Sequence, residues 1–182
     1  MSQSPYEEFQ ALIGQEGSSV TGPDEVCKEM IRHWCEAMED TNPLYTDEEY
    51  AEKSKYGSII SPPMMVSSWS LEPVWPEGQE MRYQHPEKLA QKGQLDPIDV
   101  VFDKLSEAGF FGTAATNNIL EFTRPLVLGD RVTMSSRLAS VSPEKKTRIG
   151  NGHFVTASLT YTNQRGETVC KQSLAIYPLQ AR

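Results

Sequence analysis

Two side chains that could perform acid–base chemistry, those of Asp40 and Tyr45, stand close together in the sequence, with the polar amide of Asn42 between them. A carboxylate such as that of Asp40 can take a proton from an attacking water, and the phenol of Tyr45 can deliver one to a substrate. Acid–base catalysis needs both groups within reach of one reacting molecule. We therefore treat Asp40, Asn42 and Tyr45 as candidate catalytic residues, with Asp40 as base and Tyr45 as proton donor in the simplest scheme.

The same stretch also has a purely structural interpretation. Proline disfavours the α conformation in the residue before it, so Asn42 followed by Pro43 is typical of a helix end. Thr46 and Glu49 have the spacing of a capping box, which would begin a new helix over residues 47–54. Backbone chemistry alone thus explains most of this pattern.

Composition and charge exclude several classes of function. The 182-residue chain has 17 basic and 25 acidic residues and a net charge of −8, and Lys145 and Lys146 are its only adjacent cations, so we expect no nucleic-acid partner. Cys27, His33 and Cys35 are not spaced to ligate a metal from one helix face, so we expect no metal site. Neither a secretory leader nor an apolar run of about 18 residues is present, which predicts a cytoplasmic protein outside the membrane.

Apolar residues recurring every three or four positions predict a series of helices. A short helix after Pro63, from Met64 to Leu71, is apolar on several sides, which favours burial at the centre of the fold. A long polar connection with several prolines separates it from the next helix. The predicted helices cover residues 5–13, 23–38, 47–54, 64–71 and 97–108, and the connection covers 72–96.

The last third of the chain changes from a helical period to a period of two. Strands are predicted over 114–124, 132–138, 155–162 and 167–177, and the short turns between them predict an antiparallel meander. Helices followed by strands predict a single α+β domain. We interpret His33 and His85 as surface residues, while a functional role for His153 stays open beside a structural one.

The candidate catalytic stretch resembles the Asp-x-Asn-Pro-x-His motif of MaoC-like hydratases, which are hotdog-fold enzymes that add water to 2-enoyl-CoA thioesters. The match includes Asp47, Tyr50 and Ala51, continues through the run from Gly57 to Met65, and extends over most of residues 20–178. It implies an antiparallel sheet wrapped around a central helix. The whole chain, 1–182, would then be one hotdog domain, with extra helices at its amino terminus and in an insertion over 72–111.

This chain departs from the family's catalytic pattern at two places. Tyr45 stands where MaoC-like hydratases have histidine, and a phenol has an unperturbed pKa near ~10. Pro62 and Pro63 stand where the family has a backbone N–H that polarises the thioester carbonyl, and proline has no N–H. The resemblance therefore implies that Asp40, Asn42 and Tyr45 are remnants of a catalytic site. It makes Pro62, Pro63, Met64 and Trp69 candidate substrate-binding residues.

Consecutive prolines at this position resemble the amino-terminal MaoC dehydratase subgroup, which is related to the hydratase half of fungal-type fatty-acid synthase. Further likeness, over Glu107 to Phe110 and Ala115 to Asn117, is to the larger, non-catalytic subunits of heteromeric enoyl-CoA hydratases that act on steroid side chains. On this basis the chain would shape the acyl pocket. A smaller MaoC-like partner, joined edge to edge, would supply the Asp and His, and coenzyme A would arrive with the substrate, without another cofactor.

Two alternatives remain open from the sequence. The first is a scaffold, a hotdog homodimer that holds acyl-CoA or another protein without performing chemistry. The second is an autonomous hydratase or dehydratase that uses Asp40 and Tyr45.

Overall fold

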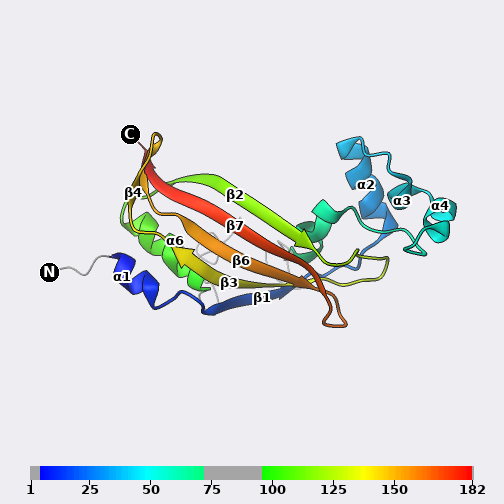
Figure 1. Cartoon of the computed structure of the whole chain (residues 1–182), viewed down its shortest axis with the longest axis horizontal. Helices are drawn as coiled ribbons and strands as arrows, with labels where there is room; N and C mark the ends of the chain where they lie inside the picture. Colours follow the sequence, from blue (N-terminus) through cyan, green and yellow to red (C-terminus); the bar gives the residue numbers. More distant parts are fainter. Residues whose placement is uncertain (1–4, 72–95, 182) are drawn as a thin grey trace, which may run out of the picture.

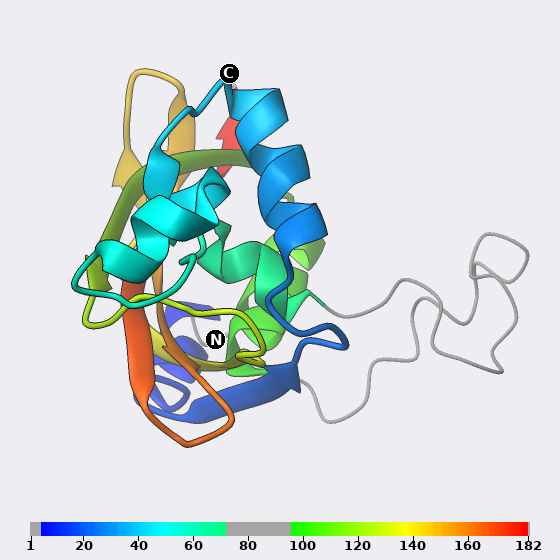
Figure 2. The same ribbon diagram turned by 90° about the vertical axis from the view of Figure 1, so that its right-hand side faces the viewer.

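The computed structural model describes residues 5–71 and 96–181. An antiparallel sheet forms most of the length of the molecule. The helices α2, α3 and α4 gather beyond one end of its strands, and α1 and α6 lie near the other end (Figure 1). Seen along the strands, the sheet curls around the short helix η1 (Figure 2). The expected α+β arrangement of a sheet around a central helix is therefore confirmed. Within the described ranges, no helix is both long enough and apolar enough to cross a membrane.

The sheet has seven strands, which form the path β1-β3-β6-β7 with β2 on the other side of β7. A small hairpin of β4 and β5 also pairs with the carboxyl-terminal end of β7. β2 therefore lies at an edge of the sheet, with β7 as its partner within the described chain. The strands are β1 (Glu16–Thr21), β2 (Gly112–Phe122), β3 (Thr133–Val141), β4 (Lys145–Lys146), β5 (Gly150–Gly152), β6 (Val155–Thr162) and β7 (Thr168–Ala181).

Two apolar clusters cover the inner face of this sheet. One surrounds η1 (Pro63–Ser70) and includes Met65, Val66 and Trp69. The other joins α1 (Pro5–Gln10) and α6 (Pro97–Glu107) to β3 and β6 through Phe9, Leu105 and other buried residues. The predicted central helix is confirmed in place, although it is a 3₁₀ helix. The remaining helices are α2 (Lys28–Met38), α3 (Pro43–Thr46) and α4 (Glu48–Lys53).

The predicted helix over 23–38 begins five residues later than expected, at Lys28. Val26 N–H donates to the carbonyl of Asp130, and the Val26 carbonyl accepts from Gly129 N–H. The buried Val26 side chain belongs to the core around η1. These pairings keep the segment extended, so Pro23 and the acidic residues after it lie outside the helix.

The predicted capping box at Thr46 is wrong by one residue. Asp47 is the N-cap of α4, and its carboxylate accepts from Tyr50 N–H at 3.0 Å. Thr46 ends the preceding helix α3, where its hydroxyl donates to the Asn42 carbonyl at 3.4 Å. Because Thr46 is the last residue of α3, the residue that caps α4 is the next one, Asp47.

The predicted meander is also wrong in one respect, because β2 pairs with β7 rather than with β3. Between β2 and β3 the chain therefore passes over β7 and β6 and enters the sheet beside β1, which is the strand at the opposite edge. The sequence does not predict β1, because Glu16–Thr21 begins with glutamate and glycine, which are depleted in strands. The segment takes its strand conformation from pairing with β3. The predicted connection over 72–96 lies outside the described residues except for Asp96.

Asp96 ties α6 to the sheet. Its carboxylate caps the helix by accepting from Ile98 N–H, and it also accepts from Ser18 N–H at 2.8 Å and from the Ser136 hydroxyl at 2.5 Å. Burial alone would raise the pKa of Asp96, but the hydrogen bonds from Ser136, Ser18 and Ile98 outweigh it, and the pKa is lowered. A Cβ on Gly17 would lie 2.2 Å from the Ser136 oxygen, so a larger residue there would displace the hydrogen bond between Ser136 and Asp96.

We expect Asp96→Ala to lower the free energy of unfolding by about 2 kcal/mol, because a helix cap and two links to the sheet are lost together. A carboxyl whose pKa is lowered in the folded state stabilises the fold fully at pH values above its unfolded-state pKa of about 4. This stabilisation is lost as the pH falls through the pKa of the folded state. The difference between wild type and the variant should therefore be largest at neutral pH and shrink below about pH 4. Urea titrations at several pH values measure this, and a difference that grows towards low pH would contradict it.

Candidate functional site

The turn from Asp40 to Tyr45 uses its polar side chains to hold its own backbone. Asp40 follows Glu39, which ends α2 in the left-handed conformation at φ 54°. The Asp40 carboxylate accepts from Asn42 N–H at 3.0 Å, and the Asn42 side chain accepts from Leu44 N–H at 3.1 Å as the cap of α3. The turn therefore has the structural role that its sequence allowed.

Tyr45 is partly buried against the core around η1. Burial raises the pKa of its phenol, the charge of Asp40 raises it further, and a hydrogen bond with Asn42 opposes the shift. The phenol is thus protonated at neutral pH, so it can donate a proton but cannot act as a base as a histidine would.

A cavity of about 240 Å³ lies between the amino-terminal end of η1 and the loop that follows β2. Most of its wall is apolar, and Arg124 is the one cation among its lining residues. The segment before η1 is fixed to this loop, because Ser61 N–H donates to the Leu126 carbonyl at 2.9 Å. The cavity is lined by Tyr56, Ile60, Ser61, Pro62, Pro63, Val66, Phe122, Thr123, Arg124, Pro125, Leu126 and Val169.

A second cavity, of about 230 Å³, lies between α2 and the start of α4, and Tyr45 lines it. Ile59 belongs to this second cavity and Ile60 to the first. Ile60 N–H also donates to the Leu44 carbonyl at 3.2 Å, so the turn and the first cavity share one backbone segment. The two halves of the predicted site are therefore neighbours, but Tyr45 and the prolines line different cavities.

The N-cap and the first residue of η1 have no backbone donor to offer a developing negative charge. Pro62 and Pro63 line the first cavity without an N–H group, and Met65 N–H is already bonded to the Pro62 carbonyl at 3.0 Å. An oxyanion site needs free donors that point at the reacting oxygen. The structure thus agrees with the sequence that this end of η1 presents two apolar rings to the cavity.

The other two predicted substrate-binding residues lie elsewhere. Trp69 is buried in the core, where its indole N–H donates to the Ser61 hydroxyl at 2.9 Å. Met64 is exposed and lines neither cavity. Trp69 therefore supports the cavity wall from behind, and contact of these side chains with substrate stays a prediction.

An ionic network holds the loop after β2 against the β6–β7 turn. Arg124 forms an ion pair with Glu167, while Arg165 joins Glu167 to the buried carboxylate of Asp130. Hydrogen bonds from Asn163 and Arg165 lower the pKa of Glu167 to about 2, with the charges of Arg124 and Arg165 acting in the same direction. The Nε of Arg124 is buried and makes no hydrogen bond within the described chain.

Sequence reasoning did not select Tyr56, Ser61, Phe122 or Arg124 as site residues. Arg124 and Pro125 lie at a strand end before a glycine turn, which was a usable signal because loops at strand ends often carry function. Phe122 and Ser61 had no such signal, since only the curl of the sheet brings them together.

The described histidines have structural surroundings. His153 is buried, its Nδ1 lies 2.9 Å from the Ser142 carbonyl, and its ring packs edge-on against Phe9 and Phe110. His33 is exposed near Glu36 on α2, and His85 lies outside the described residues. Among the described residues, no group of three His, Cys, Asp or Glu side chains could hold a metal ion.

Comparison with known proteins gives concordant results for family and fold. The family described as FAS1-like, dehydratase domain region, matches residues 11–172. The probable enoyl-CoA hydratase alpha subunit of Thermomonospora curvata is 38% identical over 174 residues, which are 94% of this chain and 51% of that protein. The 3-oxo-4,17-pregnadiene-20-carboxyl-CoA hydratase alpha subunit of Mycobacterium tuberculosis is 28% identical over 76% of this chain and 40% of its own length. The chain thus spans about half or less of these relatives.

Solved structures agree on the fold. A chain of the ChsH1–ChsH2 complex from Mycobacterium tuberculosis superposes with a TM-score of 0.80 at 24% identity, covering 99% of this chain and 92% of its own. A MaoC-like dehydratase from Rhodospirillum rubrum superposes with a TM-score of 0.57 at 17% identity, covering 92% and 94%. The chain therefore belongs to the FAS1-like dehydratase-region family, and its fold is the MaoC-like hotdog.

Proposed function

We propose that this chain is a subunit of a heteromeric 2-enoyl-CoA hydratase, in which a smaller MaoC-like partner supplies the catalytic Asp and His. The observation that carries the proposal is the state of this chain's own site. Tyr45 is a protonated phenol beside one cavity, while Pro62 and Pro63 close the start of η1 at another. Water addition needs a base and an oxyanion donor at the same acyl group, and the geometry here separates their positions.

The comparisons support a subunit role. Two relatives are named as alpha subunits of hydratases, and one superposing chain comes from a complex of two proteins. For this chain, the apolar cavity beside Pro62 and Pro63 is the proposed acyl-binding surface. We further propose that the acyl group is bulky and apolar, such as a steroid side-chain thioester, with coenzyme A as part of the substrate.

The partner is proposed to join at the open edge of β2, which is the side that no other described strand pairs with. Thr123 N–H donates to the Val169 carbonyl at 2.9 Å. In this part of β2, the backbone N–H and C=O groups of the odd-numbered residues therefore point towards β7. Successive residues of a strand point their N–H and C=O groups in opposite directions. The backbone groups of Asn118, Leu120 and Phe122 therefore point towards the open edge. Another strand can pair there and satisfy these groups.

The test is an assay of water addition to 2-enoyl-CoA substrates, short and bulky, by this chain, by a MaoC-like subunit with an intact Asp-x-Asn-Pro-x-His motif, and by their mixture. We expect the mixture to exceed this chain alone by at least about a hundredfold, because acid–base groups typically contribute that much. Full activity from this chain alone would contradict the proposal. An inert homodimer that ignores the second protein would favour the scaffold alternative.

Two conservative variants test whether this chain keeps any chemistry of its own. Tyr45→Phe retains the packing of the ring, and Asp40→Asn retains an oxygen for the Asn42 N–H. We expect kcat/KM of the mixture to stay within about threefold of wild type for both, because the proposed acid and base belong to the partner. Steady-state kinetics measures this, and a hundredfold loss in either variant would support the autonomous mechanism instead.

A further inference from the structure

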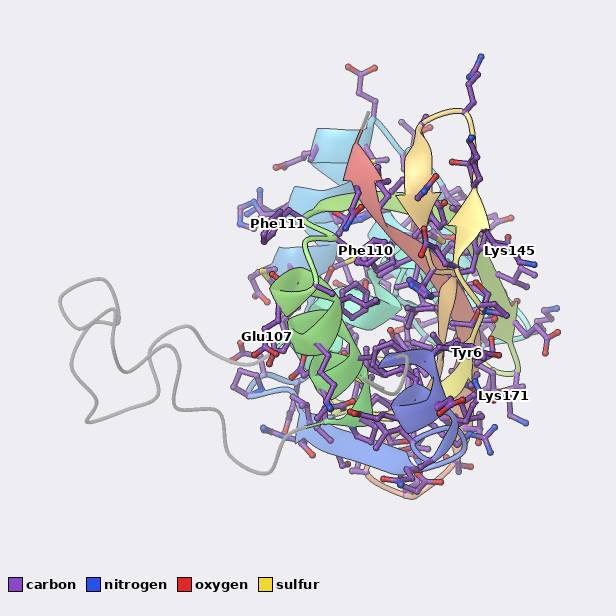
Figure 3. All side chains as sticks on the ribbon, turned by 90° about the vertical axis from the view of Figure 1, so that its left-hand side faces the viewer. Tyr6, Glu107, Phe110, Phe111, Lys145 and Lys171 are labelled. Atoms are coloured by element: carbon purple, nitrogen blue, oxygen red, sulfur yellow. The ribbon has the colours of Figure 1, made fainter. Side chains whose placement is uncertain are left out.

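Two consecutive phenylalanines between α6 and β2 have opposite surroundings. Phe110 packs against the buried His153, with ring centroids 5.1 Å apart. Phe111 is 78% exposed, the most exposed of the large hydrophobic side chains in the described chain. Figure 3 shows Phe110 directed into the space between α6 and the sheet and Phe111 directed away from it.

The backbone holds Phe111 in this exposed position. Gly109 N–H donates to the Ser106 carbonyl and Phe110 N–H to the Leu105 carbonyl, both at 2.9 Å, and Gly109 has a φ of 92°. These are the paired bonds of a Schellman motif, which ends α6 rigidly. Gly112 then pairs with Leu179 in the sheet, so Phe111 is fixed from both sides.

The proposed edge pairing brings Phe111 to the partner's site. β2 runs from Gly112 to Phe122, and its midpoint is Asn117. If a strand of the same fold pairs antiparallel across this midpoint, the start of one strand lies beside the end of the other. In this chain the end of β2 forms the wall of the cavity that faces Pro62 and Pro63. A partner with the same fold would have the corresponding cavity at that end of its own strand, which is where the proposed function places the acyl group.

We infer that Phe111 forms part of the acyl-binding wall of the partner's catalytic site and helps select enoyl-CoA substrates with large apolar acyl groups. This inference rests on the proposed function. A large apolar side chain that remains exposed on a rigid backbone marks a contact surface, and the covering group here is the partner together with its bound acyl chain. Phe111 is thus a specificity-determining residue supplied in trans.

The experiment compares Phe111→Ala, Phe111→Leu and wild type in the assembled complex, with a short substrate, crotonyl-CoA, and a long one, 2-decenoyl-CoA. We expect Phe111→Ala to raise KM for the long substrate by about tenfold, because it removes apolar contact area from the acyl chain. The kcat values and the KM for crotonyl-CoA should stay within about twofold, and Phe111→Leu should recover most of the loss. Met38→Ala, another exposed apolar residue at 61%, is the control and should change neither KM.

The outcomes distinguish a failure of the role of Phe111 from a failure of the proposed hydratase-subunit function. An active wild-type mixture with an unchanged substrate profile in Phe111→Ala would overturn the role of Phe111 alone. The role of Phe111 would also be overturned if Phe111→Ala bound the partner more weakly but showed normal KM values for both substrates at saturating partner concentrations. Phe111 would then be a contact for assembly only. An inactive wild-type mixture would overturn the proposed function, and the role of Phe111 with it.

Discussion

Asn118→Pro is expected to separate this chain from its partner while leaving its own fold intact. The Asn118 N–H faces the open edge of β2, so a proline there removes no hydrogen bond from the β2–β7 ladder. It does remove a donor that the partner's strand would use, and the ring obstructs the approach of that strand. The combined cost of about 3 kcal/mol corresponds to a dissociation constant raised by at least about a hundredfold.

Two neighbouring variants make this result specific. Asn118→Ala also loses the side-chain hydrogen bond from Gln172, at 2.8 Å, but keeps the backbone N–H, so it should bind almost normally. Asn117→Pro removes an N–H that faces β7, so it should destabilise the chain itself. Titration by isothermal calorimetry, with circular dichroism as the check on folding, distinguishes the three. Normal partner binding by a folded Asn118→Pro variant would exclude the β2 edge as the interface.

Asp130→Ala is expected to lower the free energy of unfolding by about 2–3 kcal/mol. The Asp130 side chain is 1% exposed, and its carboxylate accepts from Val127 N–H and from Arg165, both at 3.0 Å. Removal leaves a backbone donor without its partner, which costs more than the hydrogen bond itself contributes. Arg165 is half exposed and recovers solvation, which keeps the loss below that of a fully buried ion pair.

The loop held by Asp130 also carries the cavity wall, so this variant should weaken acyl binding as well as stability. The matched control is Asp103→Ala, which removes an exposed carboxylate from α6 and should change the free energy of unfolding by less than about 0.5 kcal/mol. Thermal and urea unfolding of both variants provide the comparison. Equal stabilities would show that the loop is held by its apolar contacts alone.

Local patterns in the sequence were sufficient for the elements whose stabilising contacts are local. The helix predicted over 97–108 is α6, because its cap at Asp96 and its glycine stop at Gly109 are adjacent in the chain. The alternation over 155–162 predicted β6 with its exact limits. The helix predicted over 23–38 began too early, because a distant turn at Gly129 and Asp130 holds Val26 in an extended conformation.

At the candidate site, the sequence alone showed which catalytic groups of the family this chain does not have. The identity of Tyr45 and the absence of an N–H at Pro62 and Pro63 are properties of the residues themselves, and the resemblance to MaoC-like hydratases shows that both depart from the catalytic pattern of that family. Only the tertiary structure decided which groups share a cavity. The curl of the sheet brings Phe122 and Arg124 against Pro62, while one backbone segment keeps Tyr45 on the other side. The position of β2 at the edge, and hence the exposed Phe111, likewise depends on long-range strand pairing, which no local pattern encodes.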